Sequence, residues 1–347
     1  MTSPLFSPFH LRKMKVRNRV MMSPMSQNSA TETGEATNWH MVHYGSRAVG
    51  GCGIVLMEDT AVAENGRVSS KSLCLYDERH VAGLRDIVRF CQDHGAKVGI
   101  QLAHAGRKAW RDRREDDIGR VSTDEESFAD DWGRPQALDE AEILSIVDDF
   151  VKSARLALLA GFDFIEIHAA HGYLIHQFLS PLSNRRDDGF GRNADGRQRL
   201  LLDVVRAVRD VWPEDRPLLC RLPAQDGHPD GLDEAAMIAI AGRLGEYGVD
   251  MLDVAASNVT PACETILPAQ MHSAAAQIRE IHRLPTTTAG AKDAEHANAL
   301  LSSGTMDIIA IGRPLLTNPY WALAFAQEDD RAAIWPKQYL LAMPKAG

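Results

Sequence analysis

The sequence lacks the short motifs that mark several common kinds of site. It has no C-x-x-C pair and no H-E-x-x-H, so the usual zinc-binding patterns are missing and we expect no metal. No predicted strand is followed by G-x-G-x-x-G, which removes the main support for a dinucleotide-binding sheet. The cysteines are odd in number and widely spaced, which argues against a disulfide framework and predicts reduced thiols, several of them buried. They are Cys52, Cys74, Cys91, Cys220 and Cys263.

Also missing are an excess of positive charge and a long apolar run. The formal net charge is −9 and the pI is about 5.8, so no global positive field would hold the chain to nucleic acid or to an anionic membrane. No window approaches the roughly 20 apolar residues of a membrane helix, and the first residues, MTSPLFSPFH, do not resemble a signal peptide. We expect a cytoplasmic protein with a small-molecule substrate, formed by a single domain, 1–347.

Short β-branched apolar segments alternate with longer amphipathic ones along the chain. This alternation is typical of parallel strands joined by crossover helices, and eight such units close into a barrel. An open doubly wound sheet is the structural alternative. We therefore predict an α/β fold, a single (β/α)8 TIM barrel. Its predicted strands are Arg19–Met22, Gly53–Met57, Val98–Leu102, Phe164–His168, Leu218–Leu222, Met251–Val254, Thr286–Ala289 and Asp307–Ile311.

The amphipathic segments between these strands predict the helices of the barrel. Several end at a glycine directly before the next strand, as at Gly95 and Gly161, where a left-handed residue ends a helix and reverses the chain. The predicted helices are Trp39–Val49, Arg79–His94, Asp139–Leu159, Arg197–Val211, Glu234–Tyr247, Ser273–His282, Asp293–Leu301 and Tyr320–Gln327.

Two segments exceed what a minimal barrel needs. Phe9–Arg19 has short apolar runs around a polar turn and predicts an N-terminal hairpin that caps the lower end of the barrel. Arg111–Ala137 is a long loop after strand 3, and we expect it to be a lid or rim on the catalytic face. Its acidic residues indicate either a solvated surface or a face that repels anionic substrates. They are Glu115, Asp116, Asp117, Asp124, Glu125, Glu126, Asp130 and Asp131.

Glycines follow the last two predicted strands. The loops at these places in a barrel often bind phosphate. Ala289-Gly290 and Gly312-Arg313 suit this role, because glycine permits close approach of a backbone amide and arginine adds a cationic fork. The alternative is that both glycines serve only tight turns.

The segment IEIHAAHGYLIHQ concentrates polar rings at the end of the fourth predicted strand. His168 and His171 are three residues apart, so they converge only if the chain leaves the strand at Ala169-Ala170 and turns inward. Three interpretations are open: metal ligands, core residues, or neutral imidazoles that donate to a substrate oxygen, with the Tyr173 phenol as a proton donor. His176 is expected on the following helix, in a structural role.

Longer stretches around these residues carry a family resemblance. They are SPM at Ser23–Met25, GIQLAHAGRKA at Gly99–Ala109, GFDFIEIHAAHGYLIHQFLSPLSNRRDDGFG at Gly161–Gly191 and IGRPLLTNP at Ile311–Pro319. Taken in this order they closely resemble the old yellow enzyme family of FMN-dependent ene-reductases, and most of all its thermophilic-like bacterial subgroup. The resemblance runs from about Leu5 to Phe325.

The resemblance implies bound FMN, with NADPH or NADH as the electron donor. Hydride would pass from the flavin to the β-carbon of an activated C=C bond in a small cyclic or carbonyl-bearing substrate. Expected flavin contacts, including those of the phosphate loops, lie where strands end on the catalytic face. They are Ser23, Pro24, Met25, Ser26, Asp59, Gln101, Arg221, Ala289, Gly290, Gly312 and Arg313.

The resemblance also implies the substrate site. His168 and His171 would grip the oxygen of the activating group, Tyr173 would give a proton to the α-carbon, and Asn28 would contact the substrate. Two donors aimed where enolate charge develops would stabilise the transition state more than the ground state.

Three positions depart from the pattern of the subgroup. Ser26 stands where the subgroup usually has Cys, Asn28 where it has Tyr, and Asp59 where it has a small neutral residue. We expect an altered flavin potential and an altered substrate fit. Asp59 is open to three interpretations: a solvated loop residue, a site for a cationic or donor-rich substrate, or an acid/base.

The C-terminal tail departs as well. The subgroup commonly ends with an arginine that reaches a neighbouring subunit, whereas WPKQYLLAMPKAG has Leu, Ala and Met there, leaving Lys337 as the residue that can approach a neighbour. A homo-oligomer, dimer or tetramer, is expected from the resemblance. The alternative functions are flavin-dependent desaturation or oxidation, dearomatising reduction or isomerisation of a cyclic substrate, and a non-catalytic flavin-binding protein.

Overall fold

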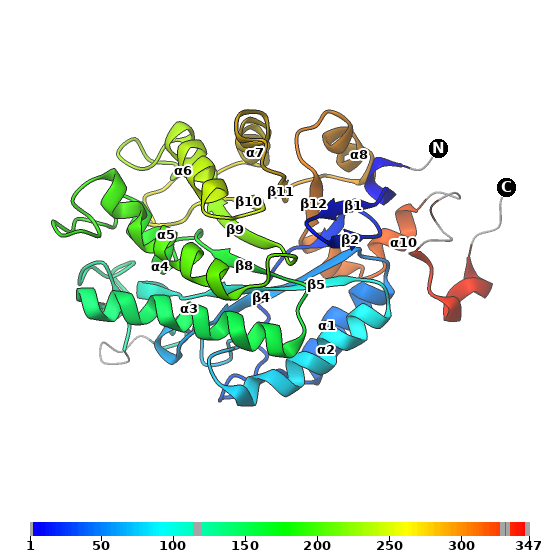
Figure 1. Ribbon diagram of the computed structural model, residues 1–347, viewed down its shortest axis with the longest axis horizontal. Coiled ribbons are helices and arrows are strands. Elements are labelled where there is room, and N and C mark those ends of the chain that lie inside the picture. Colours follow the sequence, from blue (N-terminus) through cyan, green and yellow to red (C-terminus); the bar gives the residue numbers. More distant parts are fainter. Residues whose placement is uncertain (1–2, 114–118, 327–329, 331–333, 344–347) are drawn as a thin grey trace.

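A closed barrel of eight parallel strands forms the centre of the protein (Figure 1), in the order β10-β11-β12-β3-β4-β5-β8-β9. The computed structural model describes residues 3–113, 119–326, 330 and 334–343. The predicted barrel is confirmed, and each predicted strand is present with small shifts at its ends. The barrel strands are β3 (Val20–Met22), β4 (Ile54–Ala61), β5 (Lys97–Ala103), β8 (Phe164–His168), β9 (Leu218–Pro223), β10 (Met251–Ala255), β11 (Thr286–Thr288) and β12 (Ile308–Ile311).

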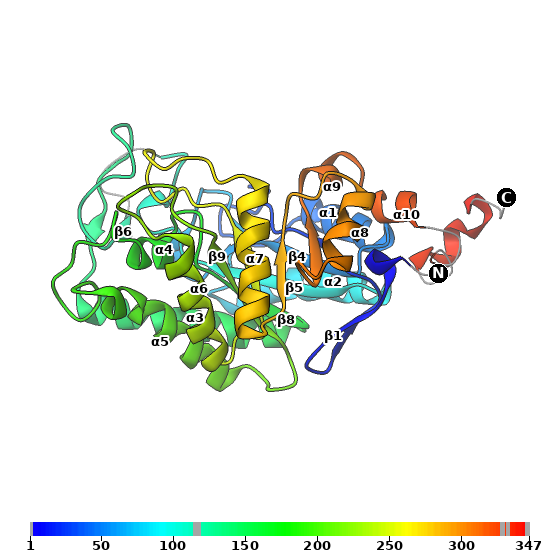
Figure 2. The same cartoon turned by 90° about the horizontal axis from the view of Figure 1, so that it is seen from above.

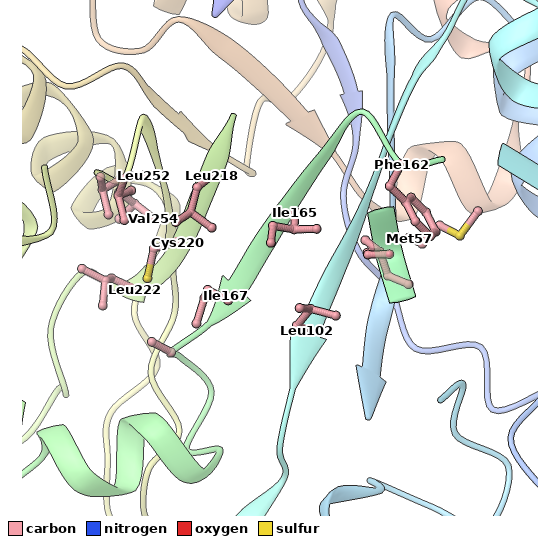
Figure 3. Packing of buried hydrophobic residues seen from close by; sticks show 14 of the residues in the cluster. Met57, Leu102, Phe162, Ile165, Ile167, Leu218, Cys220, Leu222, Leu252 and Val254 are labelled. Carbon is pink, nitrogen blue, oxygen red and sulfur yellow. The ribbon is translucent and has the colours of Figure 1, made fainter. Parts of the chain in front are cut away.

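Alternate residues along most of the barrel strands face two different apolar clusters. In β4, Val55 and Met57 join the cluster between barrel and helices, whereas Ile54 and Leu56 join the cluster inside the barrel. Figure 3 shows the outer cluster, with Met57, Ile165 and neighbouring side chains on the helix-facing side of their strands. This burial of both faces explains why the strands read as nearly continuous apolar runs.

A hairpin closes the lower end of the barrel, as predicted. Strands β1 (Phe9–Leu11) and β2 (Met14–Val16) pair antiparallel. Leu11, Met14 and Val16 are buried in the inner cluster of the barrel. Their packing seals the floor, so the opposite end, where the strands terminate, is the end that can hold a ligand.

Helices surround the barrel, and Figure 2 shows α7 and α8 on its outer side. Helix α4 carries His176, as expected, although its bounds were not predicted, and the short helix α9 was not predicted. Each is only one or two turns long and follows a functional loop. Helix α7 begins five residues before its predicted start, at Pro268. The final predicted helix is confirmed only as α10, since its predicted end, Gln327, lies outside the described residues. The α-helices are α1 (Asn38–Val49), α2 (Val81–Asp93), α3 (Glu140–Ala160), α4 (Leu174–Leu179), α5 (Ala194–Val211), α6 (Glu234–Glu246), α7 (Pro268–His282), α8 (Ala294–Ser302), α9 (Arg313–Thr317) and α10 (Trp321–Phe325).

The long loop after β5 lies at the rim, as predicted. It contains the short parallel strands β6 (Val121–Ser122) and β7 (Gln136–Ala137). The predicted acidic residues Glu115, Asp116 and Asp117 lie outside the described residues.

The described acidic residues of the rim are interleaved with arginines. Glu125 pairs with Arg134 at 3.7 Å and Glu126 with Arg185 at 3.1 Å. The described part of the rim is therefore mixed in charge, which favours the solvated-surface interpretation over repulsion of anions.

Candidate active site

A layer of polar side chains lies inside the barrel above its apolar floor. Gln101, Glu166, Arg221 and Asp253 each stand between neighbours that belong to the outer apolar cluster, so their own side chains face the interior. Gln101 Nε2 donates to Glu166 Oε1 at 2.7 Å, and Arg221 Nε lies 3.0 Å from Asp253 Oδ2. Of these four residues, the sequence predicts only Gln101 and Arg221 as part of the site.

Burial raises the pKa of both carboxyl groups in this layer. For Glu166 the nearby Asp253 raises the pKa further, while Arg221 lowers it in both groups. Glu166 Oε2 and both oxygens of Asp253 have no hydrogen-bond partner in the described part of the chain. Burial of both groups and repulsion from Asp253 favour the protonated form of Glu166, and Arg221 offsets the remaining negative charge.

A β-bulge brings Asp59 into this layer. Met57 pairs with Ile100, but the next pair is Asp59 with Gln101, so Glu58 is the extra residue of β4. Glu58 instead receives a hydrogen bond from the Tyr44 hydroxyl at 2.8 Å, on the helix side. The register therefore places Asp59 on the interior face beside Gln101.

Asp59 is not a solvated loop residue, and that interpretation is wrong. Its exposed fraction is 7%, and Ser26 Oγ donates a hydrogen bond to Asp59 Oδ1. Burial, and then the neighbouring Glu58, raise the pKa of Asp59 to about 7.

Asn28 has a positive φ of 50°, and its Oδ1 accepts a hydrogen bond from Ser69 Oγ at 2.8 Å.

The structure brings the predicted imidazoles together. Strand β8 ends at His168, and the chain turns through Ala169-Ala170 to His171, whose φ is 56°. His171 Nδ1 lies 3.2 Å from His168 Nε2, and the Tyr173 ring lies 4.9 Å from the His168 ring. The predicted convergence of these side chains is confirmed.

Both imidazoles are neutral at physiological pH. Burial above all, and then nearby positive groups such as Arg221, place the pKa of His168 and of His171 well below the usual value. Ala170 N–H donates to His168 Nδ1 at 3.2 Å, so the His168 proton is on Nε2 and points at His171. Burial, and then Asp59, raise the pKa of Tyr173, which therefore keeps its phenolic proton.

Lys108, which sequence reasoning missed as a site residue, supports this turn. Its Nζ donates to the carbonyl oxygen of His171 at 2.8 Å and to that of Asn258 at 3.0 Å. Asn258 also has a positive φ, of 119°. One buried ammonium group thus holds two loops whose backbones are in sparsely populated conformations.

A second network supports the turn from helix α4. His176 Nδ1 accepts a hydrogen bond from Gly172 N–H at 2.9 Å, and His176 Nε2 lies 2.8 Å from Asp226 Oδ1. Asp226 also accepts from Ser180 Oγ at 2.6 Å. The expected structural role of His176 is confirmed, whereas Asp226 has no sequence signal that links it to the site.

The predicted phosphate loops line one cavity. It has a volume of about 790 Å³, and Ser23, Arg221, Gly290, Gly312 and Arg313 are among its lining residues. Two observations fit a bound flavin nucleotide. Ser23 Oγ is buried with no hydrogen-bond partner in the described residues, and a Cβ at Gly312 would fit without a clash, with Met25 Sδ 3.7 Å away in ordinary van der Waals contact. The lining also includes Pro24, Met25, Pro268, Ala289, Ala291, Ala310, Ile311, Pro314 and Thr317.

Other findings concern metals, thiols and membranes. No cluster of three or more metal-binding side chains occurs within the described residues. Every cysteine is a free thiol, and all except Cys263 are buried. Among the helices that the structure describes, none has the length and apolarity needed to cross a membrane.

A parallel barrel with a phosphate-type cavity at the ends of β11 and β12, and with paired neutral imidazoles at the end of β8, defines a cofactor-dependent barrel enzyme. The chain belongs to the NADH:flavin oxidoreductase / NADH oxidase family, whose model matches residues 4–330. It is 42% identical over 330 residues to an NADPH dehydrogenase of Geobacillus sp. (strain WCH70), covering 94% of this chain and 95% of the relative.

Solved structures of morphinone reductase have a fold similar to that of this chain. Morphinone reductase superposes with a TM-score of 0.80 at 27% identity, covering 96% of this chain and 93% of that one. A structure of morphinone reductase in complex with tetrahydroNAD superposes with a TM-score of 0.76 at 26% identity, covering 99% and 98% of the two chains.

Proposed function

We propose that this protein is an FMN-dependent oxidoreductase that uses NADPH or NADH to reduce an electron-poor C=C bond in a small, carbonyl-bearing substrate. The observation that carries the proposal is the approach of His168 Nε2 and His171 Nδ1 to 3.2 Å, beside the Tyr173 phenol. Family membership, the NADPH dehydrogenase relative and the nicotinamide analogue on morphinone reductase support the cofactor and the electron donor.

The chain supplies binding groups for the cofactor. Gly290, Gly312 and Arg313, with the unpartnered Ser23 hydroxyl, would hold the phosphate and its chain. The remaining contacts would come from side chains of the polar layer and of the β3 loop, namely Gln101, Arg221, Ala289, Pro24, Met25, Ser26 and Asp59. When bound and reduced, the flavin supplies a hydride to the β-carbon of the alkene.

The imidazoles polarise the substrate. His168 carries a proton on Nε2, which points at His171 Nδ1 in the structure. With a substrate carbonyl between the rings, His171 would take its Nδ1–H tautomer instead, so that one carbonyl oxygen can accept from both imidazoles. Because negative charge on that oxygen grows in the transition state, the two bonds strengthen as reaction proceeds. Because its pKa is raised, Tyr173 stays protonated and can deliver its phenolic proton to the α-carbon. Asn28, pinned by Ser69, would border the substrate.

Purified protein tests the proposal. We expect a bound flavin in the visible spectrum and NADPH consumption with 2-cyclohexen-1-one and N-methylmaleimide, with a saturated C–C bond in the product. A yellow protein that reduces neither compound would contradict the ene-reductase activity. A colourless protein that FMN cannot reconstitute would contradict the cofactor assignment.

We also propose one domain, a homo-oligomeric state and a cytoplasmic location. Large apolar side chains are exposed near the C-terminal end of the described chain, with exposed fractions of 43% for Phe325 and 104% for Leu341. Contact with a second copy would bury them. Light scattering after size-exclusion chromatography tests the oligomer, and a monomer would contradict it.

The reduced thiols and the nicotinamide donor support the proposed cytoplasmic location.

A further inference from the structure

Two adjacent acids, Glu58 and Asp59, are buried near the C-terminal end of β4, at the mouth of the barrel where its strands end. Glu58 is 1% exposed and Asp59 is 7% exposed. The Glu58 carboxylate is occupied, because it accepts from Tyr44 hydroxyl at 2.8 Å and from Gln27 N–H at 2.6 Å. Among the described side chains, only Ser26 donates a hydrogen bond to Asp59, from its hydroxyl to Oδ1. In the described chain, no hydrogen bond reaches Asp59 Oδ2.

In the part of the chain that the structure describes, neither acid forms an ion pair with a lysine or arginine. In the described residues the basic group within ion-pair distance of Glu58 is His40, at 3.4 Å, and Asp59 has none. Among the described residues, the other titratable groups that interact with Asp59 are Arg111, whose side chain is exposed, and the neutral phenols of Tyr44 and Tyr173. A buried carboxylate without a counter-ion is costly unless a positive partner arrives.

Asp59 lies on the side of the mouth where a substrate would sit. It is one of the charges that raise the pKa of Tyr173, so its carboxyl is within electrostatic range of the proposed proton donor. The strand register places it beside Gln101, two strands from His168 around the barrel. A ligand whose oxygen is held at β8 can therefore present another group to β4.

We propose that Asp59, oriented by Ser26, binds a positively charged group of the substrate, so that the protein prefers activated alkenes that carry an ammonium nitrogen. The Ser26 hydroxyl donates to Oδ1 and leaves Oδ2 to accept from an N–H⁺ or to face a quaternary nitrogen. Burial makes this contact stronger than a surface ion pair, because little water screens it. This inference rests on the proposed ene-reductase function and names its substrate class.

Two isosteric enones test the preference. The probes are 5,5-dimethyl-2-cyclohexen-1-one and 1,1-dimethyl-3-oxo-1,2,3,6-tetrahydropyridinium, which replaces the quaternary carbon by a cationic nitrogen. We would measure the Kd of each probe for the oxidised FMN-loaded protein from the change in its visible spectrum, and kcat/KM in turnover. The ratio of the two probes cancels the shape they share, and comparing variants cancels the intrinsic reactivity of the cation.

Asp59→Asn removes the charge and keeps the size of the side chain. We expect the preference for the cation, taken as the ratio of the two probes, to fall at least about tenfold, equal to about 1.4 kcal/mol. Asp130→Asn, at an exposed rim position, is the matched control and should leave the ratio unchanged. In the unmutated protein the preference should rise from pH 6 to pH 8 as Asp59 ionises, a measurement that needs no variant.

Equal binding of both probes by unmutated protein that reduces 2-cyclohexen-1-one would overturn the inference and leave the proposed function standing. An unchanged ratio in Asp59→Asn, or a pH-independent ratio, would also overturn it. If the protein binds the cation through Asp59 but reduces no enone, the cation site stands and the proposed function fails.

Discussion

Lys108 Nζ donates a hydrogen bond to the carbonyl oxygen of His171 at 2.8 Å. The same nitrogen binds the carbonyl of Asn258, and both of these residues have a positive φ. Lys108 is 8% exposed, and burial, followed by repulsion from Arg107, lowers its pKa to about 7. The position of His171, and with it the donor pair, thus depends on a lysine that touches no part of the imidazole ring.

Lys108→Met tests this dependence. Methionine keeps the apolar stem but leaves two buried carbonyls without their donor, which costs roughly 1–3 kcal/mol. We expect kcat/KM for 2-cyclohexen-1-one to fall about 10- to 100-fold, while the Kd for FMN changes little. Lys152→Met, on the exposed face of α3, is the control. Full activity in Lys108→Met would show that the turn holds His171 by itself.

The His176–Asp226 network makes a separate prediction. Asp226→Ala removes the partner of His176 Nε2 and Ser180 Oγ inside the protein. We expect a loss of about 2–4 kcal/mol in the free energy of unfolding and a lower kcat, because Gly172 loses its anchored acceptor. Asp230→Ala, at an exposed position of the same loop, should change stability by less than about 0.5 kcal/mol. Similar urea midpoints for the two variants would contradict the network.

Two glycines of the phosphate cavity should respond differently to alanine. A Cβ at Gly312 meets only ordinary contacts, whereas at Gly290, with φ of 106°, it would lie 2.7 Å from Pro268 Cβ. Gly312→Ala should keep the stability of the apoprotein within about 1 kcal/mol and weaken FMN binding at least about tenfold, because the methyl group occupies space needed by the phosphate.

Gly290→Ala should instead destabilise the apoprotein by about 1–3 kcal/mol. Fluorescence titration with FMN and thermal unfolding of apoprotein measure the two effects. Unchanged FMN affinity in Gly312→Ala would place the phosphate elsewhere.

Ionisation of Asp59 should lower the free energy of unfolding as pH rises. Its folded pKa of about 7 lies above its unfolded value of 3.8, so the folded state binds the extra proton between these pH values. The contribution of Asp59 is therefore lost as pH rises through this window. Asp59→Asn mimics the neutral acid, so between pH 5.5 and pH 8 it should gain about 2 kcal/mol relative to the unmutated protein. A constant difference in urea unfolding would contradict the raised pKa.

The sequence predicts the barrel well because each strand is buried on both faces and so reads as a short apolar run. These runs alternate with amphipathic helical segments, which is a strong local signal. It also predicts that His168 and His171 converge where the chain leaves the strand, whereas their role as a donor pair is implied only by the family resemblance. Asp59 is picked out by the sequence, but its orientation is not, because only the bulge at Glu58 decides which of the two adjacent acids faces the interior. Lys108 and Asp226 were missed because their partners are backbone atoms or residues distant in the chain, which no spacing rule connects.

The most direct test of the paired imidazoles is reoxidation of the dithionite-reduced protein by 2-cyclohexen-1-one, followed by stopped-flow absorbance in His168→Ala, His171→Ala and unmutated protein. We predict that each substitution slows the reaction with the enone at least about 100-fold and leaves the reaction with oxygen within about threefold. An enone rate equal to that of the unmutated protein in either variant would contradict the assignment of His168 and His171 as the groups that hold the substrate oxygen.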